Sequence, residues 1–281
     1  MNAESVVEQP AGLERILRFP LVWLLVGIVG VGGVSALTAG GPPVLAAVGA
    51  VAAVAVYWVV MRYVARRSTP EIAWAGAVSN AAIGIVLGVV FIAASVLMVV
   101  TEFSFTRASG DTASIVATMV AIQLGAAVTE ELLFRGLALQ ALERVCGSWV
   151  ALAITAVFFG LLHLANPGAT LWSSFTIAVE AGVLLGAAFL WRRNIWLVVG
   201  LHFAWNTSVG LLGIPVSGHP ATGVLTAHPT GPELLTGGGF GLEASIVPVI
   251  VSLVLAVPML ILAHRRGNLV PLRRPSAPPV V

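Results

Sequence analysis

The chain has little charge, no lysine and a single cysteine. Only 9% of its 281 residues are charged, whereas 58% are hydrophobic, and its mean hydropathy is +1.01. Ordinary soluble domains do not have this composition, so the sequence indicates a membrane protein with several spans. The lone Cys146 excludes an internal disulfide and a cysteine metal cluster.

All fourteen basic residues are arginines, and most stand in short segments between apolar runs. A pI of 9.3 would suggest nucleic-acid binding in a soluble protein. However, the sequence has neither a stripe of basic and aromatic residues nor a phosphate-binding loop. The arginines instead predict how the chain is oriented in a bilayer. We therefore expect a lipid bilayer as a partner and no nucleic acid.

Apolar runs of about 20 residues, long enough to cross a bilayer as helices, predict about eight spans. We expect an all-α, polytopic transmembrane helical bundle over residues 20–266, after a polar N-terminus at 1–19. The tail 267–281 is rich in Pro and Arg and is expected to be disordered. The spans are roughly 20–38, 43–62, 78–101, 113–140, 148–165, 170–191, 195–213 and 244–263.

The arginines also predict which side of the membrane each end occupies. With the N-terminus in the cytoplasm, twelve of the fourteen lie on the inner side, Arg107 lies outside and Arg135 lies within a span. Short cytoplasmic loops carry an excess of basic residues, so we expect both termini in the cytoplasm. A composition rich in alanine, valine and arginine without lysine is typical of bacteria. It predicts a multi-pass protein of the bacterial cytoplasmic membrane.

Ionisable side chains inside spans are costly and mark functional sites, and four predicted spans carry polar side chains of this kind. At about 1.5 Å per residue, each lies about 14–21 Å from an arginine or tryptophan at the inner end of its helix. Polar groups at one depth on four helices predict a shared cavity. They are Glu130, Glu131 and Arg135 in the fourth span, His163 in the fifth, Glu180 in the sixth, and His202 and Asn206 in the seventh.

The spacing within these helices separates two kinds of residue. Glu131 and Arg135 are four residues apart, which favours a structural ion pair on one helix face. Glu130 is turned about 100° away from Glu131 and is free to face another group. Phe159 shares a face with His163 and is expected to pack in the core. Glu180 is expected to be structural and is only a second-tier candidate for function.

The polar set has the equipment to hydrolyse an amide without a covalent intermediate. One carboxylate and one imidazole can hold and deprotonate water, while a second imidazole and a carboxamide can stabilise an oxyanion. Zinc held by Glu130, His163 and His202 is the competing mechanism, although the motifs H-E-x-x-H and H-x-x-E-H are absent. The same residues are also compatible with a transporter or proton relay and with a non-catalytic scaffold or immunity protein.

Three short motifs, in this order on three predicted spans, resemble those of one known family. They are similar to the signatures of the CPBP family, the type II CAAX prenyl proteases and bacteriocin-processing (abortive-infection) membrane proteins. The resemblance covers about residues 113–213, the expected catalytic core. The motifs are "EELLFRG" with Glu130, Glu131 and Arg135, "FGLLH" with Phe159 and His163, and "HFAWN" with His202 and Asn206.

The resemblance implies an intramembrane endopeptidase with a cavity open to the cytoplasm, and it implies a role for each matched residue. Glu130 and His163 would activate water, and His202 and Asn206 would form the oxyanion site. Glu131 and Arg135 would brace the helix. The resemblance favours a glutamate-type mechanism, so we expect no cofactor, with zinc as the alternative.

Eukaryotic members of the family cleave prenylated C-terminal tails. Bacteria generally lack protein prenylation, so the resemblance and the composition together predict another substrate. We expect a peptide or the tail of a membrane protein, in peptide processing, bacteriocin immunity or protein turnover.

Overall fold

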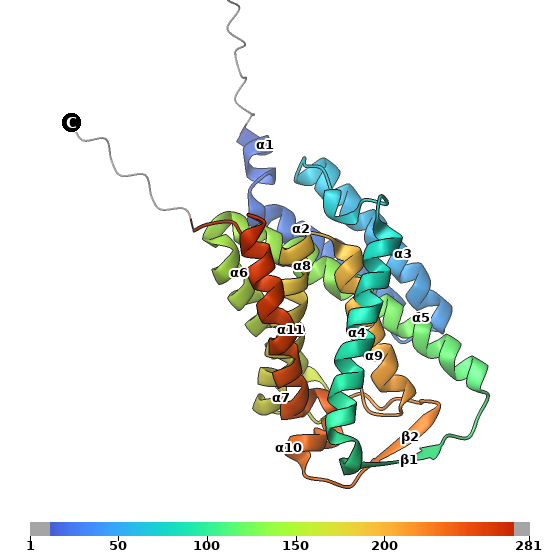
Figure 1. Cartoon of the computed structure of the whole chain (residues 1–281). Coiled ribbons are helices and arrows are strands. Elements are labelled where there is room, and N and C mark those ends of the chain that lie inside the picture. The colour runs from blue at the N-terminus through green and yellow to red at the C-terminus, as the bar shows by residue number, and fades with distance from the viewer. Residues whose placement is uncertain (1–11, 273–281) are drawn as a thin grey trace, which may run out of the picture.

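The computed structural model describes residues 12–272, apart from the side chains of residues 13–15, and shows a bundle of helices (Figure 1). Most of the predicted polar N-terminus lies outside the described residues, as does the end of the tail with Arg273 and Arg274. Within the described part, the all-α bundle predicted from the apolar runs is confirmed. In lipid, each run can satisfy its backbone hydrogen bonds only by forming a helix.

The helices follow the predicted spans to within a few residues. A short α1 (Gly12–Leu17) precedes them. The others are α2 (Pro20–Thr38), α3 (Pro43–Val59), α4 (Ala77–Val99), α5 (Thr112–Glu131), α6 (Gln140–Leu162), α7 (Leu171–Ile177), α8 (Gly186–Arg192), α9 (Ile195–Leu211), α10 (Glu233–Thr236) and α11 (Ile246–Arg265).

Short π-helical segments continue several of these helices without a break. They extend α3 over Val60–Val64, join α5 to α6 over Leu132–Leu139, and join α7 to α8 over Ala178–Leu185. Such segments often accompany functional sites. Two of the three hold residues singled out from the sequence, namely Arg135 and Glu180.

Six of the described helices are long and apolar enough to cross a membrane, judged by length and composition. One of them, Thr112–Ala165, contains two predicted spans and is bent at Gly147, where a φ of 75° favours glycine. The predicted seventh span is the shorter apolar helix Ile195–Leu211. The chain is therefore a multi-pass integral membrane protein, whereas the count of eight crossings and the side of each terminus stay predictions.

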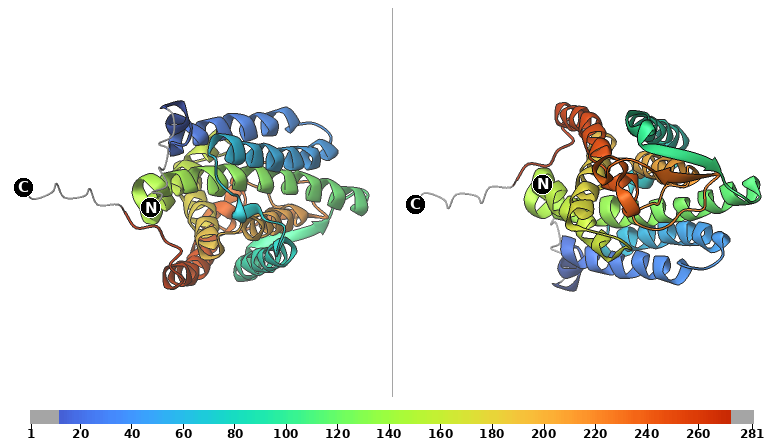
Figure 2. Two further views of the ribbon diagram at one scale, coloured as in Figure 1. Left: turned by 90° about the horizontal axis from the view of Figure 1, so that it is seen from above. Right: turned by 90° about the horizontal axis from the view of Figure 1, so that it is seen from below.

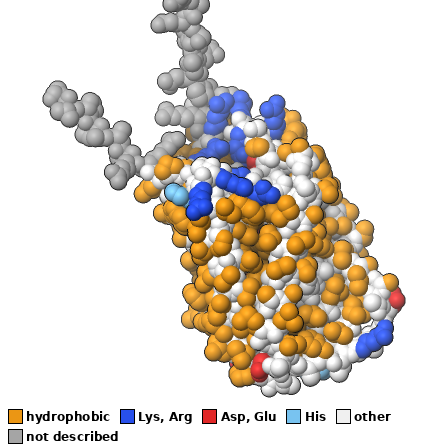
Figure 3. All heavy atoms as spheres, viewed as in Figure 1, with side chains coloured by type: hydrophobic (Ala, Val, Ile, Leu, Met, Phe, Trp, Pro, Cys, Tyr) orange, Lys and Arg blue, Asp and Glu red, His pale blue; other side chains and the backbone are white. Residues whose placement is uncertain are grey.

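The bundle has an apolar outer surface and a layered interior. Hydrophobic side chains cover the face shown in Figure 3, while arginines gather at one end. Seen along the bundle, α2 and α3 lie on one face and α4 and α11 on the opposite face (Figure 2). Helix α9 lies between these faces and packs against α4 and α5. Most of its residues are buried, so it is well placed to hold polar groups away from lipid.

The two ends of the bundle differ in charge. At one end, called here the arginine-rich end, arginines gather where α8 and α11 finish (Figures 1 and 3), with Arg193 after α8 and Arg265 closing α11. At the opposite end, called here the loop end, residues 212–245 fold beneath the helices. Their strand β2 (Leu225–Pro229) pairs antiparallel with β1 (Phe103–Arg107). No pattern singled out in the sequence predicted this two-stranded sheet.

Part of the tail that was expected to be disordered is held at the arginine-rich end. Ser148 and Val270 exchange two hydrogen bonds of 2.8 and 2.9 Å. The Asn268 amide donates to the carbonyls of Leu190 and Trp191. Polar groups at the helix ends thus supply hydrogen-bond partners for Asn268 and Val270, whereas the disorder expected of the tail stays a prediction.

Candidate functional site

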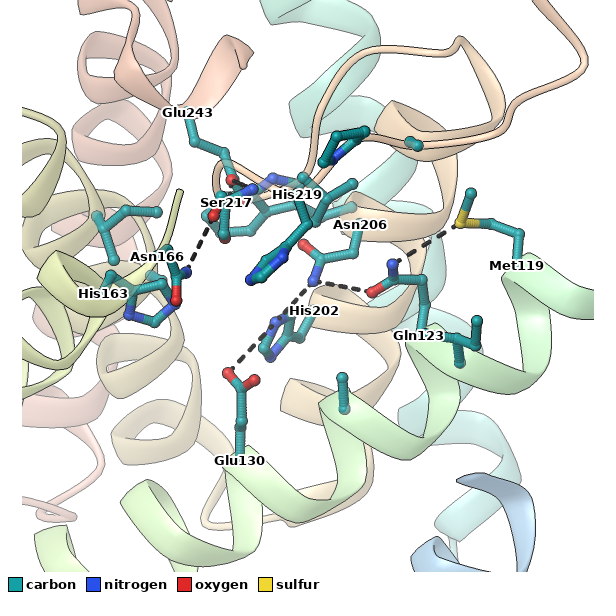
Figure 4. Close-up of a pocket in the computed structure, with 18 of the residues that line it drawn as sticks. Met119, Gln123, Glu130, His163, Asn166, His202, Asn206, Ser217, His219 and Glu243 are labelled. Atoms are coloured by element: carbon teal, nitrogen blue, oxygen red, sulfur yellow. Dashed lines mark hydrogen bonds and ion pairs between the residues drawn. The ribbon is translucent and has the colours of Figure 1, made fainter. Parts of the chain in front are cut away.

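A cavity of about 840 Å³ lies inside the bundle and reaches the loop end. Its inner wall includes Glu130 and the buried Ala181, whereas its outer wall includes the exposed Ser114, His219 and Thr222. Figure 4 shows the polar side chains that point into it from several elements. The cavity therefore opens toward the loop end and is closed toward the arginine-rich end.

Glu130 and Glu131 take different positions at the end of α5, as the predicted 100° turn requires. The side chain of Glu130 lines the cavity and is 36% exposed. Glu131 is fully buried, and its Oε1 accepts a hydrogen bond from Arg135 Nη1 at 2.9 Å. The structure thus confirms the predicted ion pair between Glu131 and Arg135.

Glu131 also has a second role that the spacing of residues did not predict. The same Oε1 lies 2.8 Å from Nδ1 of His202 on α9. A carboxylate at this distance holds the proton of the imidazole on Nδ1, so that Nε2 faces the opposite direction. Arg135 in turn donates to the carbonyls of Ala181 and Gly182. These contacts join the end of α5 to α9 and to the segment Ala178–Leu185.

His202 Nε2 faces the cavity and two polar partners. It lies 4.0 Å from Glu130 Oε2 and 3.2 Å from Asn206 Nδ2. Asn206 Nδ2 also donates to Gln123 Oε1 at 3.2 Å. Gln123 was not predicted as a site residue, although it stands seven residues before Glu130 and therefore on the same face of α5.

His163 enters the cavity from the C-terminal end of α6. Its Nδ1 lies 2.7 Å from the carbonyl oxygen of Phe159, and its ring stacks on the Phe159 ring at 4.7 Å. Phe159 is almost fully buried, as predicted, and it also fixes the orientation of His163. His163 and Glu130 lie on different walls (Figure 4), and the contacts described for Glu130 lead to His202 rather than to His163.

Glu180 does not line the cavity, although it lies on a neighbouring helical segment. It is fully buried, and neither of its carboxyl oxygens has a hydrogen-bond partner among the described residues. Of the residues expected to share a cavity, Glu130, His163, His202 and Asn206 line the same one. For Glu180 the depth argument is insufficient, because depth does not fix the direction in which a side chain points.

The loop end contributes further polar residues that were not singled out. Asn166, Ser217, His219 and Glu243 all line the cavity, and Asn166 Nδ2 donates to the carbonyl of Ser217. His219 was expected to be solvated; it is exposed, but at the rim of the cavity. The spacing of residues in an irregular loop gives no signal that would have placed these groups.

Glu243 is the second carboxyl group on the cavity wall. Ser217 donates to its Oε2 from both the backbone N–H and the hydroxyl, at 2.5 and 2.9 Å. Burial raises the pKa of Glu243, because it disfavours the charged carboxylate. The hydrogen bonds from Ser217 and the nearby His163 and His202 oppose this effect only in part.

The alternative zinc site requires Glu130, His163 and His202 to converge on one point. Over residues 12–272, no three His, Cys, Asp or Glu side chains are grouped so that they could hold a metal ion. His163 Nδ1 and His202 Nδ1 are turned toward the Phe159 carbonyl and the Glu131 carboxylate, respectively. Each Nε2 is left available, as in metal-bound histidines, so the ring orientations do not decide between the two mechanisms and the zinc alternative stays a prediction.

Comparison with known proteins matches residues 112–208 to one family model, described as type II CAAX prenyl endopeptidase Rce1-like. The matched segment runs from the start of α5 to α9 and holds all three sequence motifs. No curated protein and no solved structure matches the chain. Through residues 112–208, this multi-pass membrane protein is thus similar to the Rce1-like type II CAAX prenyl endopeptidases, which are proteases.

Proposed function

We propose that the chain is an intramembrane endopeptidase that hydrolyses peptide bonds with a water molecule activated by Glu130 and His163. The observation that carries this proposal is the shared cavity. It places a half-exposed carboxylate, two oriented imidazoles and a carboxamide around one space. This proposal assigns roles to single residues and goes further than the similarity of residues 112–208 to the Rce1-like proteases.

Glu130 is the proposed general base. Among the residues of the three motifs, it is the only carboxylate that lines the cavity. Its oxygens accept no hydrogen bond from the described residues, so a water molecule can bind there. His163 presents Nε2 toward the same space, because Nδ1 is engaged with Phe159. Glu130 takes one proton from water, and the resulting hydroxide oxygen bonds to the substrate carbonyl carbon.

His202 and Asn206 form the proposed oxyanion site. As an imidazolium, with Nδ1–H held by Glu131, His202 donates from Nε2–H to the carbonyl oxygen as negative charge develops. The Asn206 Nδ2 hydrogen that is not bonded to Gln123 then turns from Nε2 to the same oxygen as a second donor. Glu131 holds the ring of His202 in place, and Gln123 holds the carboxamide of Asn206. The carbon–nitrogen bond then breaks, and the leaving amine takes the proton from Glu130.

A peptide or a membrane-protein tail fits the cavity better than a compact folded protein. The cavity of about 840 Å³ is too small for a folded domain, and its wall of helices and the loop 216–222 mixes apolar side chains with a few polar groups. We propose such a segment as the substrate, in the cytoplasmic membrane of a bacterium. Transport and a purely scaffolding role are less favoured, because neither needs two imidazoles that are each fixed through Nδ1.

Peptidase assays of the purified protein in nanodiscs test this proposal, with a library of membrane-tail peptides. We expect Glu130→Gln and His163→Ala to lower kcat/KM by about 100-fold or more, as loss of general acid–base catalysis does. Glu233→Gln and His264→Ala are the matched controls, because both residues are exposed and lie outside the cavity. We expect both controls to keep wild-type activity.

A strong chelator separates the metal-free mechanism from the zinc mechanism. Activity that persists with the chelator supports the glutamate–water mechanism. Activity that is lost with the chelator and restored by zinc contradicts it. Wild-type levels of cleavage in Glu130→Gln would assign the reaction to different residues.

A further inference from the structure

Buried glutamates in this protein are generally paired with arginine. Three of the five buried glutamates in the described chain have such a partner: Glu71 with Arg67 at 2.8 Å, Glu131 with Arg135 at 2.9 Å, and Glu143 with Arg193 at 2.6 Å. The described residues provide no arginine for the remaining two, Glu180 and Glu243. A buried carboxylate without a cation is costly, so these two need a separate explanation.

Glu243 is 3% exposed, and it lines the cavity directly (Figure 4). Both hydrogen bonds described for its side chain end on Oε2, where Ser217 N and Ser217 Oγ donate. Oε1 is therefore left without a donor from the described residues. The Ser217 bonds also fix the direction of the carboxyl group, so that Oε1 is a positioned acceptor rather than a mobile one.

The charges around Glu243 favour a positively charged ligand. Two glutamates, Glu130 and Glu243, line the cavity, and none of its described lining residues is an arginine. His163 and His202 are the titratable groups facing Glu243 from α6 and α9, and Glu180 acts on it electrostatically from the segment Ala178–Leu185. A cation that entered the cavity would meet an oriented carboxylate in surroundings of low dielectric constant, where the attraction is strong.

We propose that Glu243 is a specificity-determining residue that binds a cationic group of the peptide substrate through Oε1. The group is the ammonium or guanidinium of a Lys or Arg side chain, or the free N-terminal ammonium of a peptide. This inference rests on the proposed endopeptidase function and adds a substrate class to it. Glu243 stands outside the matched segment 112–208, so the preference is a property of this chain's loop end.

Matched peptides test the inference in full-length protein in nanodiscs. In a peptide that the wild type cleaves, each side chain in turn is replaced by Lys and by norleucine, which has similar length and no charge. Each peptide is made with a free and an acetylated N-terminus. We expect Lys to raise kcat/KM about tenfold or more over norleucine at one position, or acetylation to lower it as much, as charge-assisted hydrogen bonds do.

Glu243→Gln is the decisive variant, since a glutamine oxygen can still accept the Ser217 bonds while the charge is lost. We expect it to lose the preference for Lys yet cleave the norleucine peptide within about threefold of wild type, whereas Glu233→Gln keeps the preference. The inference is overturned if the wild type shows no charge preference, or if Glu243→Gln retains one.

A binding measurement keeps this test separate from the proposed function. Glu130→Gln protein, with and without Glu243→Gln, is titrated with the same Lys and norleucine peptides. One outcome is that the Lys peptide binds more tightly only when Glu243 is present, while the wild type cleaves neither peptide. This outcome would remove the proposed activity and keep the cation subsite. Cleavage by the wild type together with equal binding of the Lys and norleucine peptides would keep the proposed activity and remove the cation subsite.

Discussion

Glu131 connects the residues of the candidate site more than any other side chain. Its Oε1 accepts from Arg135 within its own helical segment and lies 2.8 Å from His202 on α9. One carboxylate therefore neutralises a buried guanidinium and orients an imidazole at the same time. Adjacent glutamates are needed here because one acid cannot both brace the bundle and face the cavity. Glu130 is free for chemistry because Glu131 carries the structural contacts.

Glu243 predicts a specific pH dependence of stability. Burial raises its pKa in the folded protein above the ordinary value of 4.5, so the folded state binds a proton that the unfolded state releases. The stabilisation is complete below the unfolded pKa and is lost as the pH rises through the folded pKa. Glu243→Gln cannot titrate at this position. We therefore expect the melting temperature of the wild type, relative to Glu243→Gln, to fall by a few degrees between about pH 4 and the folded pKa.

Thermal unfolding of both proteins in the same detergent, from pH 4 to pH 8, measures this difference. The two proteins differ only in the carboxyl group of Glu243, so the difference between their melting temperatures reports on this group. A difference in melting temperature that stays constant over the range, or rises with pH, would contradict the raised pKa.

At the scale of whole elements, close contact between α4 and α9 sets the position of His202 and Asn206. A Cβ on Gly84 of α4 would lie 2.0 Å from the carbonyl oxygen of Leu197, and a Cβ on Gly200 of α9 would lie 2.3 Å from that of Ala81. Backbone atoms cannot give way as side chains do. Small residues at such positions allow helices in membranes to approach closely.

Gly84→Ala should therefore push α9 away from α4. We expect a loss of about 1–3 kcal/mol of stability, as overpacking usually causes, and at least about tenfold lower kcat, because the oxyanion donors shift. Gly33→Ala in α2 is the control, since a Cβ there meets nothing within 4 Å. Thermal unfolding and peptidase assays of both variants check this. If Gly84→Ala and Gly33→Ala had the same stability and the same kcat, the α4–α9 contact would not position the site.

The helices were largely predictable from the sequence, because a run of apolar residues in lipid has few other ways to bond its backbone. The motif residues were predictable too, since polar groups in a span must meet one another. The contact between Glu131 and His202 was not, because these residues are 71 positions apart and either glutamate could have faced α9. Glu243 and Ser217 escaped notice because only the folded loop 212–245 brings them beneath the helices.

At the scale of the whole molecule, the cavity and the arginines lie at opposite ends. The family resemblance implied a cavity open to the cytoplasm, whereas the arginines place their own end there. The structure puts the exposed rim, with Ser114 and His219, at the loop end. The mouth of the cavity and the arginine-rich end therefore cannot both face the cytoplasm. Positive charge next to the spans sets orientation during insertion, so we expect the arginine-rich end in the cytoplasm and the substrate to enter from the opposite side.

Single-cysteine labelling decides between these orientations. In a Cys146→Ser background, which removes the only native thiol, a cysteine is placed at the exposed Thr230 at the loop end or at the exposed Ser68 near the arginine-rich end. We expect a membrane-impermeant maleimide to label Thr230→Cys in intact cells, and to label Ser68→Cys only after permeabilisation. The reverse pattern would place the mouth of the cavity in the cytoplasm and make the arginine-based orientation wrong. Peptidase activity of both variants confirms that the labelled protein is folded, so the side from which the substrate reaches Glu130 follows directly from which cysteine reacts.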